Sequence, residues 1–231
     1  MQRRDFIGVC AASTLTAALP CPAADAKPRY YARARLDDER GQAVKGRALA
    51  VERNFIFHYP YAATPCFLLN LGKPTTQAAT LKTEDAQIYH WDGGVGPDRN
   101  IVAYSAICAH KLSYPTRDIS FISYSPEAMR HNGHAHVIHC CSENSQYDPY
   151  AGAKVVSGPA PQPLAAILLD YDAVSDELFA LGTLGGEMFN EFFRRFEFRL
   201  SMEYGSRAHQ AVEGSCAVSE LTHFCKQQIK C

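Results

Sequence analysis

Three short stretches carry most of the information in this chain: Cys108-Ala109-His110, Cys140-Cys141-Ser142-Glu143-Asn144-Ser145-Gln146-Tyr147-Asp148 and Gly158-Pro159-Ala160-Pro161-Gln162-Pro163-Leu164. The first combines a thiol with an imidazole and the second contains two thiols, and both kinds of group are ligands of iron and zinc. A Cys-x-His triplet alone is common by chance, so it indicates a metal site only together with the segments before and after it. Residues 101–107 are predicted to form a strand that leads into the first stretch, and the other two stretches follow it.

Together, the three stretches resemble the cluster-binding core of Rieske iron–sulfur proteins, over roughly residues 95 to 182. In that family two cysteines hold one iron of a [2Fe–2S] cluster and two histidines hold the other. The resemblance implies one [2Fe–2S] cluster, bound in this chain by the ligands Cys108, His110 and Cys140, with Glu143 at the position of the second histidine. It also implies that the hydroxyl groups of Ser145 and Tyr147 donate hydrogen bonds to the cluster and to cysteine sulfur, which raise the potential.

Backbone geometry tests the register of the second stretch. Ser145-Gln146-Tyr147-Asp148 aligns with the family without gaps, which puts Asn144 at a family glycine and Glu143 at the family histidine. Asparagine tolerates a positive φ better than other non-glycine residues, so this register is favoured. The rival register uses Cys141 as the second thiolate and Asn144 as the fourth ligand. An amide is a poor iron ligand, and Tyr147 would be displaced.

Two further features bear on the fourth ligand and on the loops. The stretch between the two ligand motifs contains four histidines that are alternative ligand candidates: His131, His134, His136 and His139. His139 precedes Cys140 on a predicted strand, so the two side chains are expected to face opposite sides. Many members of the family also join their two loops by a disulfide. Ser113 and Ser142 occupy the matching positions, so that clamp is expected to be absent.

The N-terminal segment predicts export. Arg3-Arg4 before Asp5-Phe6-Ile7 is typical of a twin-arginine signal, with cleavage after Ala26. Its apolar run, residues 8–19, is shorter than the about 20 residues that span a bilayer. We therefore expect a periplasmic protein that contacts a membrane only through a partner or an uncleaved signal. Twin-arginine substrates cross folded, which suits a protein that receives its cluster in the cytoplasm.

Composition limits the remaining classes. About 205 residues follow the signal, enough for one hydrophobic core. Lys and Arg total 23 against 24 Asp and Glu, with no basic stripe, so no nucleic-acid partner is expected. Seven of the nine cysteines lie after the signal, and those outside the cluster are candidates for disulfides in an oxidising compartment. Their connectivity does not follow from the sequence.

Short strands separated by Gly and Pro turns predict an all-β fold, a Rieske-like antiparallel β-sandwich with a cluster-binding subdomain. Residues 165–171 and 177–182 have the pattern of a hairpin pair. The C-terminal part is mixed: Phe189, Phe192, Phe193 and Phe196 have helical spacing, whereas residues 196–200 alternate like a strand. Residues 218–229 are predicted to form a short helix with Ser219 as N-cap. The expected segments are a signal (1–26), an N-terminal β region (27–94), the Rieske-like domain (95–182) and a C-terminal extension (183–231).

The expected function is single-electron transfer by an exported protein, alone or as a subunit of a periplasmic or membrane-associated redox complex with partner redox proteins. An electron-transfer component is expected rather than a stand-alone enzyme. The alternative is a degenerate fold without a [2Fe–2S] cluster, acting as a structural or interaction subunit or binding a mononuclear metal. An oxygenase is disfavoured, because only about fifty residues follow residue 182 and it needs a second domain with an open iron site.

Overall fold

The computed structural model describes residues 25–75, 78–128 and 134–231. The predicted export signal therefore lies almost entirely outside the described residues. The strands are β1 (Arg29–Asp37), β2 (Phe55–His58), β3 (Pro65–Asn70), β4 (Ala79–Lys82), β5 (Ile88–Trp91), β6 (Ile101–Ser105), β7 (Ile119–Ser120), β8 (Ile122–Ser125), β9 (Val137–Cys140), β10 (Ser145–Asp148), β11 (Lys154–Ser157), β12 (Ala166–Asp172), β13 (Glu177–Leu184), β14 (Gly214–Ala217), β15 (Ser219–Glu220) and β16 (Gln227–Gln228). The α-helices are α1 (Phe189–Tyr204) and α2 (Leu221–Phe224), and 3-10 turns cover Gly46–Ala48, Pro149–Ala151 and Gly205–Arg207. The predicted all-β class is confirmed.

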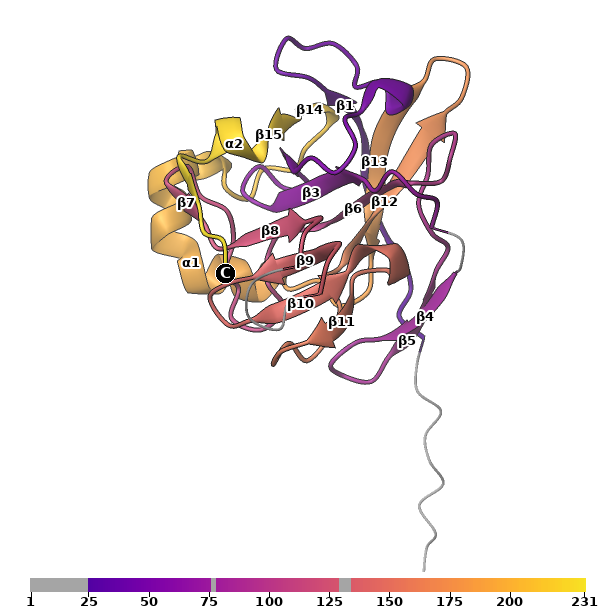
Figure 1. The fold of residues 1–231 in the computed structure, drawn as a ribbon. Coiled ribbons are helices and arrows are strands. Elements are labelled where there is room, and N and C mark those ends of the chain that lie inside the picture. Colours follow the sequence, from indigo (N-terminus) through magenta and orange to yellow (C-terminus); the bar gives the residue numbers. More distant parts are fainter. Residues whose placement is uncertain (1–24, 76–77, 129–133) are drawn as a thin grey trace, which may run out of the picture.

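The largest sheet has eight strands in the order β14-β1-β13-β12-β6-β3-β2-β15 (Figure 1). Neighbouring strands in it are antiparallel except β1 and β14, which are parallel. The predicted hairpin is present as β12 and β13. Strands from the N-terminal, central and C-terminal parts of the chain alternate across this sheet, so segments distant in sequence share one hydrogen-bonded layer.

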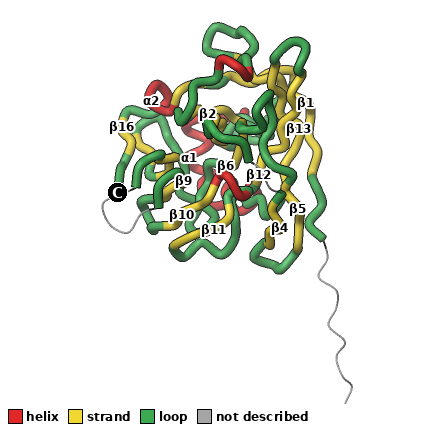
Figure 2. The backbone as a smooth tube through the Cα atoms, turned by 45° about the vertical axis from the view of Figure 1, so that its right-hand side comes forward, coloured by secondary structure: helices red, strands yellow, loops and turns green. Residues whose placement is uncertain are grey.

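A second sheet has four strands in the order β11-β10-β9-β8 and lies below the large sheet in Figure 1. Two-stranded ribbons, β4 with β5 and β16 with β7, complete the β-structure of the described residues. The tube in Figure 2 shows that loops account for much of the backbone around the small sheet. The hairpin of β9 and β10 carries the second of the sequence stretches singled out above.

The main hydrophobic core contains both predicted thiolate ligands. Cys108 and Cys140 are buried there with aromatic and aliphatic side chains that include Trp91, Tyr104 and Ile138. A second buried cluster contains Phe57, Leu68 and Cys66, and a third lies under α1. Because apolar burial is the main stabilising term in folding, the predicted ligand positions belong to the most stable part of the molecule.

Two predictions for the C-terminal part need correction. Residues 196–200 are helical and belong to α1, so the strand pattern seen there is wrong. In the helix Phe192 and Leu200 are buried, whereas Phe198 is 78% exposed. The spacing of the buried positions follows the helical repeat of about 3.6 residues rather than the repeat of two of a strand.

Residues 218–229 do not form one helix either. Ser219 lies in β15, which pairs with β2 at the edge of the large sheet, and α2 has only four residues. Glu220, not Ser219, occupies its N-cap position, and no side chain caps it. The backbone N–H groups of Val218 and Leu221 bond to carbonyls elsewhere in the fold, so tertiary pairing overrides the local helical pattern. Among the described residues, none of the helices has the length and apolar character needed to cross a bilayer.

Candidate metal centre

The first ligand stretch lies in a loop, residues 106–114, that follows the fully buried strand β6. We call this segment the first loop. The backbone N–H of Cys108 donates to the carbonyl of Ser113 at 2.8 Å, and the N–H of Leu112 donates back to the carbonyl of Cys108 at 3.0 Å. Leu112 adopts a φ of 60°, which lets the chain reverse. The loop thus closes on itself and presents Cys108 to the interior.

Helix α1 supports the outer side of the first loop. Ile107, Leu112 and Tyr114 of the loop share a buried cluster with Phe189 and Phe192 of the helix, among others. The ring of Tyr114 meets the ring of Phe192 edge to face, with centroids 4.8 Å apart. Such pairs stabilise beyond the area they bury. Helix α1 of the C-terminal extension therefore holds the first loop in place.

The second stretch forms the turn between β9 and β10, and we call residues 140–145 the second loop. Cys140 ends β9 and pairs with Ser145, the first residue of β10. Asn144 has a φ of 56°, which confirms the positive φ predicted for this position. Cys140 is fully buried in the main core, whereas its neighbour Cys141 is half-buried and bonded to Cys231 in a disulfide. Adjacent residues thus face opposite sides, as expected at a strand end.

The thiols of Cys108 and Cys140 meet between the two loops. A hydrogen bond with the Cys140 thiol lowers the pKa of Cys108 to about 6, and the Tyr147 hydroxyl adds to this effect while burial opposes it. The same hydrogen bond, burial and the charge on Cys108 raise the pKa of Cys140. The two thiols therefore titrate as a pair, in which the first proton leaves easily and the second does not.

Tyr147 lies against the first loop. Its side chain is fully buried, and its hydroxyl group is 3.3 Å from the sulfur of Cys108. The same oxygen accepts a hydrogen bond of 3.2 Å from the backbone N–H of Ala109. With that N–H as donor, the hydroxyl hydrogen is free to point at the sulfur, where it stabilises negative charge.

The imidazole of His110 and the carboxylate of Glu143 face each other across the loops. Nδ1 of His110 is buried without a hydrogen-bond partner, and it lies 3.8 Å from Oε2 of Glu143, beyond hydrogen-bond range. Lys111 holds the other carboxylate oxygen at 3.1 Å. The hydroxyl of Ser145 is likewise buried and without a partner. Buried polar atoms are normally paired, so two unsatisfied ones in the same two loops as the buried thiols indicate a site for a bound group.

The alternative histidine ligands lie elsewhere in the described residues. His136 contacts Glu52 and the hydroxyl of Tyr124, at 3.1 and 3.2 Å. His139 is 3% exposed and packs against Cys231, with Nδ1 3.4 Å from its sulfur. His134 is exposed at the edge of the loop, and His131 falls outside the described residues. None of the three described histidines is brought to Cys108 and Cys140.

A second group of His and Cys side chains is present on the outer side of the second loop. The ligand atoms of His139, Cys141 and Cys231 lie within 4.8 Å of one another. Because the two sulfur atoms are bonded to each other, neither is available as a thiolate ligand in this state. The sequence made cysteines outside the cluster candidates for disulfides, but it did not indicate this pairing, whose partners are 90 residues apart.

The third stretch packs against the second loop at Gly158. This glycine has a φ of 90°, and a Cβ atom there would lie 2.3 Å from the carbonyl oxygen of Asn144 and 2.5 Å from Cα of Ser145. Both neighbours are backbone atoms and cannot swing away. A glycine is therefore required for the third stretch to approach the second loop this closely.

Replacing Gly158 by alanine tests that contact. We expect Gly158→Ala to lower the free energy of unfolding by more than about 2 kcal/mol, because positive φ and a backbone clash act together. Gly214→Ala is the matched control, since Gly214 has a φ of 71° with nothing within 4 Å of the added carbon. Its cost should stay near about 1 kcal/mol. Equal losses in urea unfolding of the two variants would show that the contact with the second loop contributes nothing.

The chain was compared with protein-family models and with solved structures. No protein-family model matches the chain. A solved structure to which the chain is similar is the soluble domain of the Rieske protein II (soxF) from Sulfolobus acidocaldarius. The sequence identity is 27%, the match covers 66% of this chain and 78% of that chain, and the TM-score is 0.46.

The side chains that converge here fit an iron–sulfur cluster. Two buried thiols, the unpartnered Nδ1 of His110 and the carboxylate of Glu143 supply two sulfur, one nitrogen and one oxygen donor. Thiolates and imidazole are established cluster ligands. Zinc accepts the same types of donor, although among the described residues these four ligand atoms are not gathered within 4.8 Å of one another as those of His139, Cys141 and Cys231 are.

Proposed function

We propose that the protein is an exported electron-transfer protein with one [2Fe–2S] cluster, held by Cys108 and Cys140 on one iron and by His110 and Glu143 on the other. The observation that carries this proposal is the meeting of two buried thiols from separate loops, which also hold the unpartnered Nδ1 of His110 and the carboxylate of Glu143. When bound, such a cluster supplies one-electron redox chemistry.

The surrounding side chains have separate tasks in this proposal. The hydroxyl of Tyr147 stabilises negative charge on the Cys108 sulfur, which raises the reduction potential. The buried core around both cysteines would exclude water from an iron held by their sulfur atoms. The His110 side chain is 25% exposed, with Lys111 and Glu143 beside it. This edge is therefore the expected contact point for a redox partner protein.

A mononuclear metal site is the second candidate. It is favoured by the types of donor in the two loops, which are two thiols, an imidazole and the carboxylate that Lys111 contacts at 3.1 Å, because zinc accepts sulfur, nitrogen and oxygen ligands. Iron and acid-labile sulfide analysis of the purified protein, with a visible spectrum, separates the two. Two iron and two sulfide per chain with visible bands supports the cluster. A single metal ion and no sulfide supports the alternative.

Export rests on residues 1–26, and it is tested independently of the metal. Replacing Arg3 and Arg4 together by lysine is expected to leave the full-length precursor in the cytoplasm, because the paired arginines are the recognised feature of a twin-arginine signal. Cell fractionation and immunoblotting measure the distribution. Replacing Arg33 and Arg35, which lie in the strand β1, by lysine is the control and should not change it. Normal periplasmic accumulation of the Arg3/Arg4 variant would refute the assignment.

A further inference from the structure

The disulfide between Cys141 and Cys231 joins the second loop to the end of the described chain. It spans 90 residues, with Cα atoms 5.6 Å apart. Cys141 directly follows Cys140, the proposed ligand. In Figure 1 the C-terminal segment runs from α2 along β7 and ends near the hairpin of β9 and β10. The bond therefore attaches this segment to the backbone that carries the proposed ligand.

Backbone hydrogen bonds place the C-terminal segment, β7 and the second loop in one continuous band. The N–H groups of Lys226, Gln227 and Ile229 donate to carbonyls of residues 117, 118 and 120, at 3.0, 3.1 and 2.8 Å. The next carbonyl along, that of Phe121, accepts from the N–H of Cys141 at 2.6 Å. The second loop is therefore connected to the C-terminal segment in two ways, by the disulfide and by backbone hydrogen bonds through β7.

On the outer side of the second loop, the disulfide adds a covalent bond to the backbone hydrogen bond between Cys141 and Phe121. The internal backbone bond from Glu143 to Cys140 is long, at 3.4 Å. On this exposed side, the links to the first loop are a hydrogen bond of 2.7 Å between the hydroxyls of Ser113 and Ser142 and the ion pair of Lys111 with Glu143 at 3.1 Å. Exposed hydroxyl pairs exchange readily with water and restrain little. The covalent restraint on this loop comes from Cys141.

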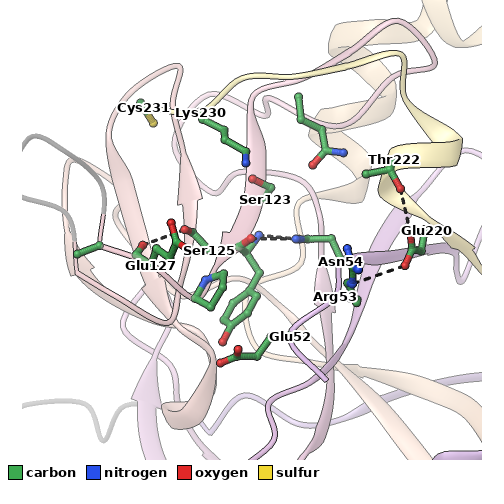
Figure 3. Close-up of a pocket in the computed structure, with 14 residues that line it drawn as sticks. Glu52, Arg53, Asn54, Ser123, Ser125, Glu127, Glu220, Thr222, Lys230 and Cys231 are labelled. Atoms are coloured by element: carbon green, nitrogen blue, oxygen red, sulfur yellow. Dashed lines mark hydrogen bonds and ion pairs between the residues drawn. The ribbon is translucent and has the colours of Figure 1, made fainter. Parts of the chain in front are cut away.

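A reductant can reach this disulfide and not the buried thiols. Both Cys141 and Cys231 are half-buried. Cys231 lines a cavity of about 650 Å³, with Ser123 and Lys230 nearby on its wall (Figure 3). Cys108 and Cys140, by contrast, are 0% exposed. Disulfide exchange requires direct access of a thiolate to sulfur, so reduction is selective for the Cys141–Cys231 bond.

We propose that the Cys141–Cys231 disulfide is a reducible tether that positions the second loop, and through it Cys140, for retention of the cluster. The consequence for the cluster rests on the function proposed above; the positioning of the loop does not. A dithiol protein or small dithiol supplies the two electrons. One of its thiolates attacks the sulfur of Cys231, the S–S bond breaks, and Cys141 leaves as a thiolate that takes up a proton. The second thiol of the reductant then displaces Cys231, which is also protonated, and the reductant becomes a disulfide.

The test compares wild type with the Cys141→Ser/Cys231→Ser double variant, which removes the bond without leaving a stray thiol. Cys225→Ser is the matched control, because Cys225 is a free cysteine in the same segment whose thiol donates to the carbonyl of Gln227 at 2.9 Å. We expect an iron chelator to bleach the double variant about tenfold faster than wild type, well below the melting temperature, because groups that orient ligands typically change metal affinity by this factor. The EPR spectrum of the reduced protein should also shift. The control should match wild type in both measurements.

Hydrogen exchange of backbone amides provides a readout that needs no cluster. Amides of residues 141–145 and of β7 should exchange faster in the double variant, and not in Cys225→Ser. A small dithiol should have the same effects on wild type and none on the double variant. Unchanged bleaching, EPR spectrum and amide exchange in the double variant would overturn the tether. If wild type contains no iron or sulfide, the proposed function is wrong. The tether is then still supported if amide exchange is faster in the double variant, and it is refuted if amide exchange is unchanged.

Discussion

Cys108→Ser and Cys140→Ser are each expected to abolish the visible absorption of the purified protein. Both sulfur atoms lie in the main core, in different loops, and no other described free cysteine lies in either loop. A serine hydroxyl is a hard, weakly acidic ligand that does not replace a thiolate on iron. An iron left with one thiolate cannot be retained in a bridged cluster, so iron and sulfide should fall to background together.

Cys66→Ser is the control for this pair. Cys66 is equally buried but belongs to the second core cluster, where its thiol donates to the carbonyl of Tyr59 at 3.1 Å. That variant should keep its visible bands. Cys141→Ser should also assemble the cluster, although it should lose it faster for the reasons given above. If purified Cys141→Ser had no visible absorption and Cys140→Ser kept it, the register of the second loop would be wrong.

Glu143→His is expected to raise the reduction potential at neutral pH, on the order of 100 mV or more. With two thiolates and two neutral imidazoles, the charges of an oxidised cluster, its sulfides and its ligands cancel. A carboxylate in place of one imidazole adds a negative charge, which disfavours the addition of an electron. The neighbouring Lys111 offsets part of that charge, since its Nζ lies 3.1 Å from the carboxylate. Removing the carboxylate leaves this positive charge beside the iron and strengthens the change.

The same variant should change the dependence of the potential on pH. Loss of a proton from a ligating imidazole makes the oxidised form more negative and lowers the potential at alkaline pH. Two imidazoles in Glu143→His should therefore give a steeper fall than the one in wild type. Redox titrations of both proteins across pH measure this. Identical titrations would show that Glu143 is not a ligand, and Cys141 or a histidine between the loops would become the better candidate.

The local features of this fold follow from the sequence, and the long-range ones do not. Alternation and Gly/Pro turns predicted strands such as β6 and the hairpin of β12 and β13, and the tolerance of asparagine for positive φ predicted the turn at Asn144. The packing of α1 on the first loop depends on contacts that only the folded chain creates. Edge pairing with β2 replaced the helix expected after Val218.

In the candidate site, too, the local features were predictable from the sequence and the long-range contacts were not. The residue types and the order of Cys108, His110 and Cys140 were visible in the sequence. The fold brings the thiols of Cys108 and Cys140 together and places His110 opposite Glu143. The ion pair of Lys111 with Glu143 and the disulfide of Cys141 depend on how two loops and a distant segment meet. Such contacts leave no periodic or spacing signal, so the sequence alone did not indicate them.

Pulsed EPR of the reduced protein, grown with ¹⁵N-labelled histidine, tests the central claim most directly. A cluster held by two cysteines, one histidine and one carboxylate should show a single strongly coupled histidine nitrogen. That coupling should disappear in His110→Ala and persist in His136→Ala, because His136 contacts Glu52 and Tyr124 instead. Two coupled nitrogens in the wild type, none at all, or one that survives the loss of His110 would contradict the account.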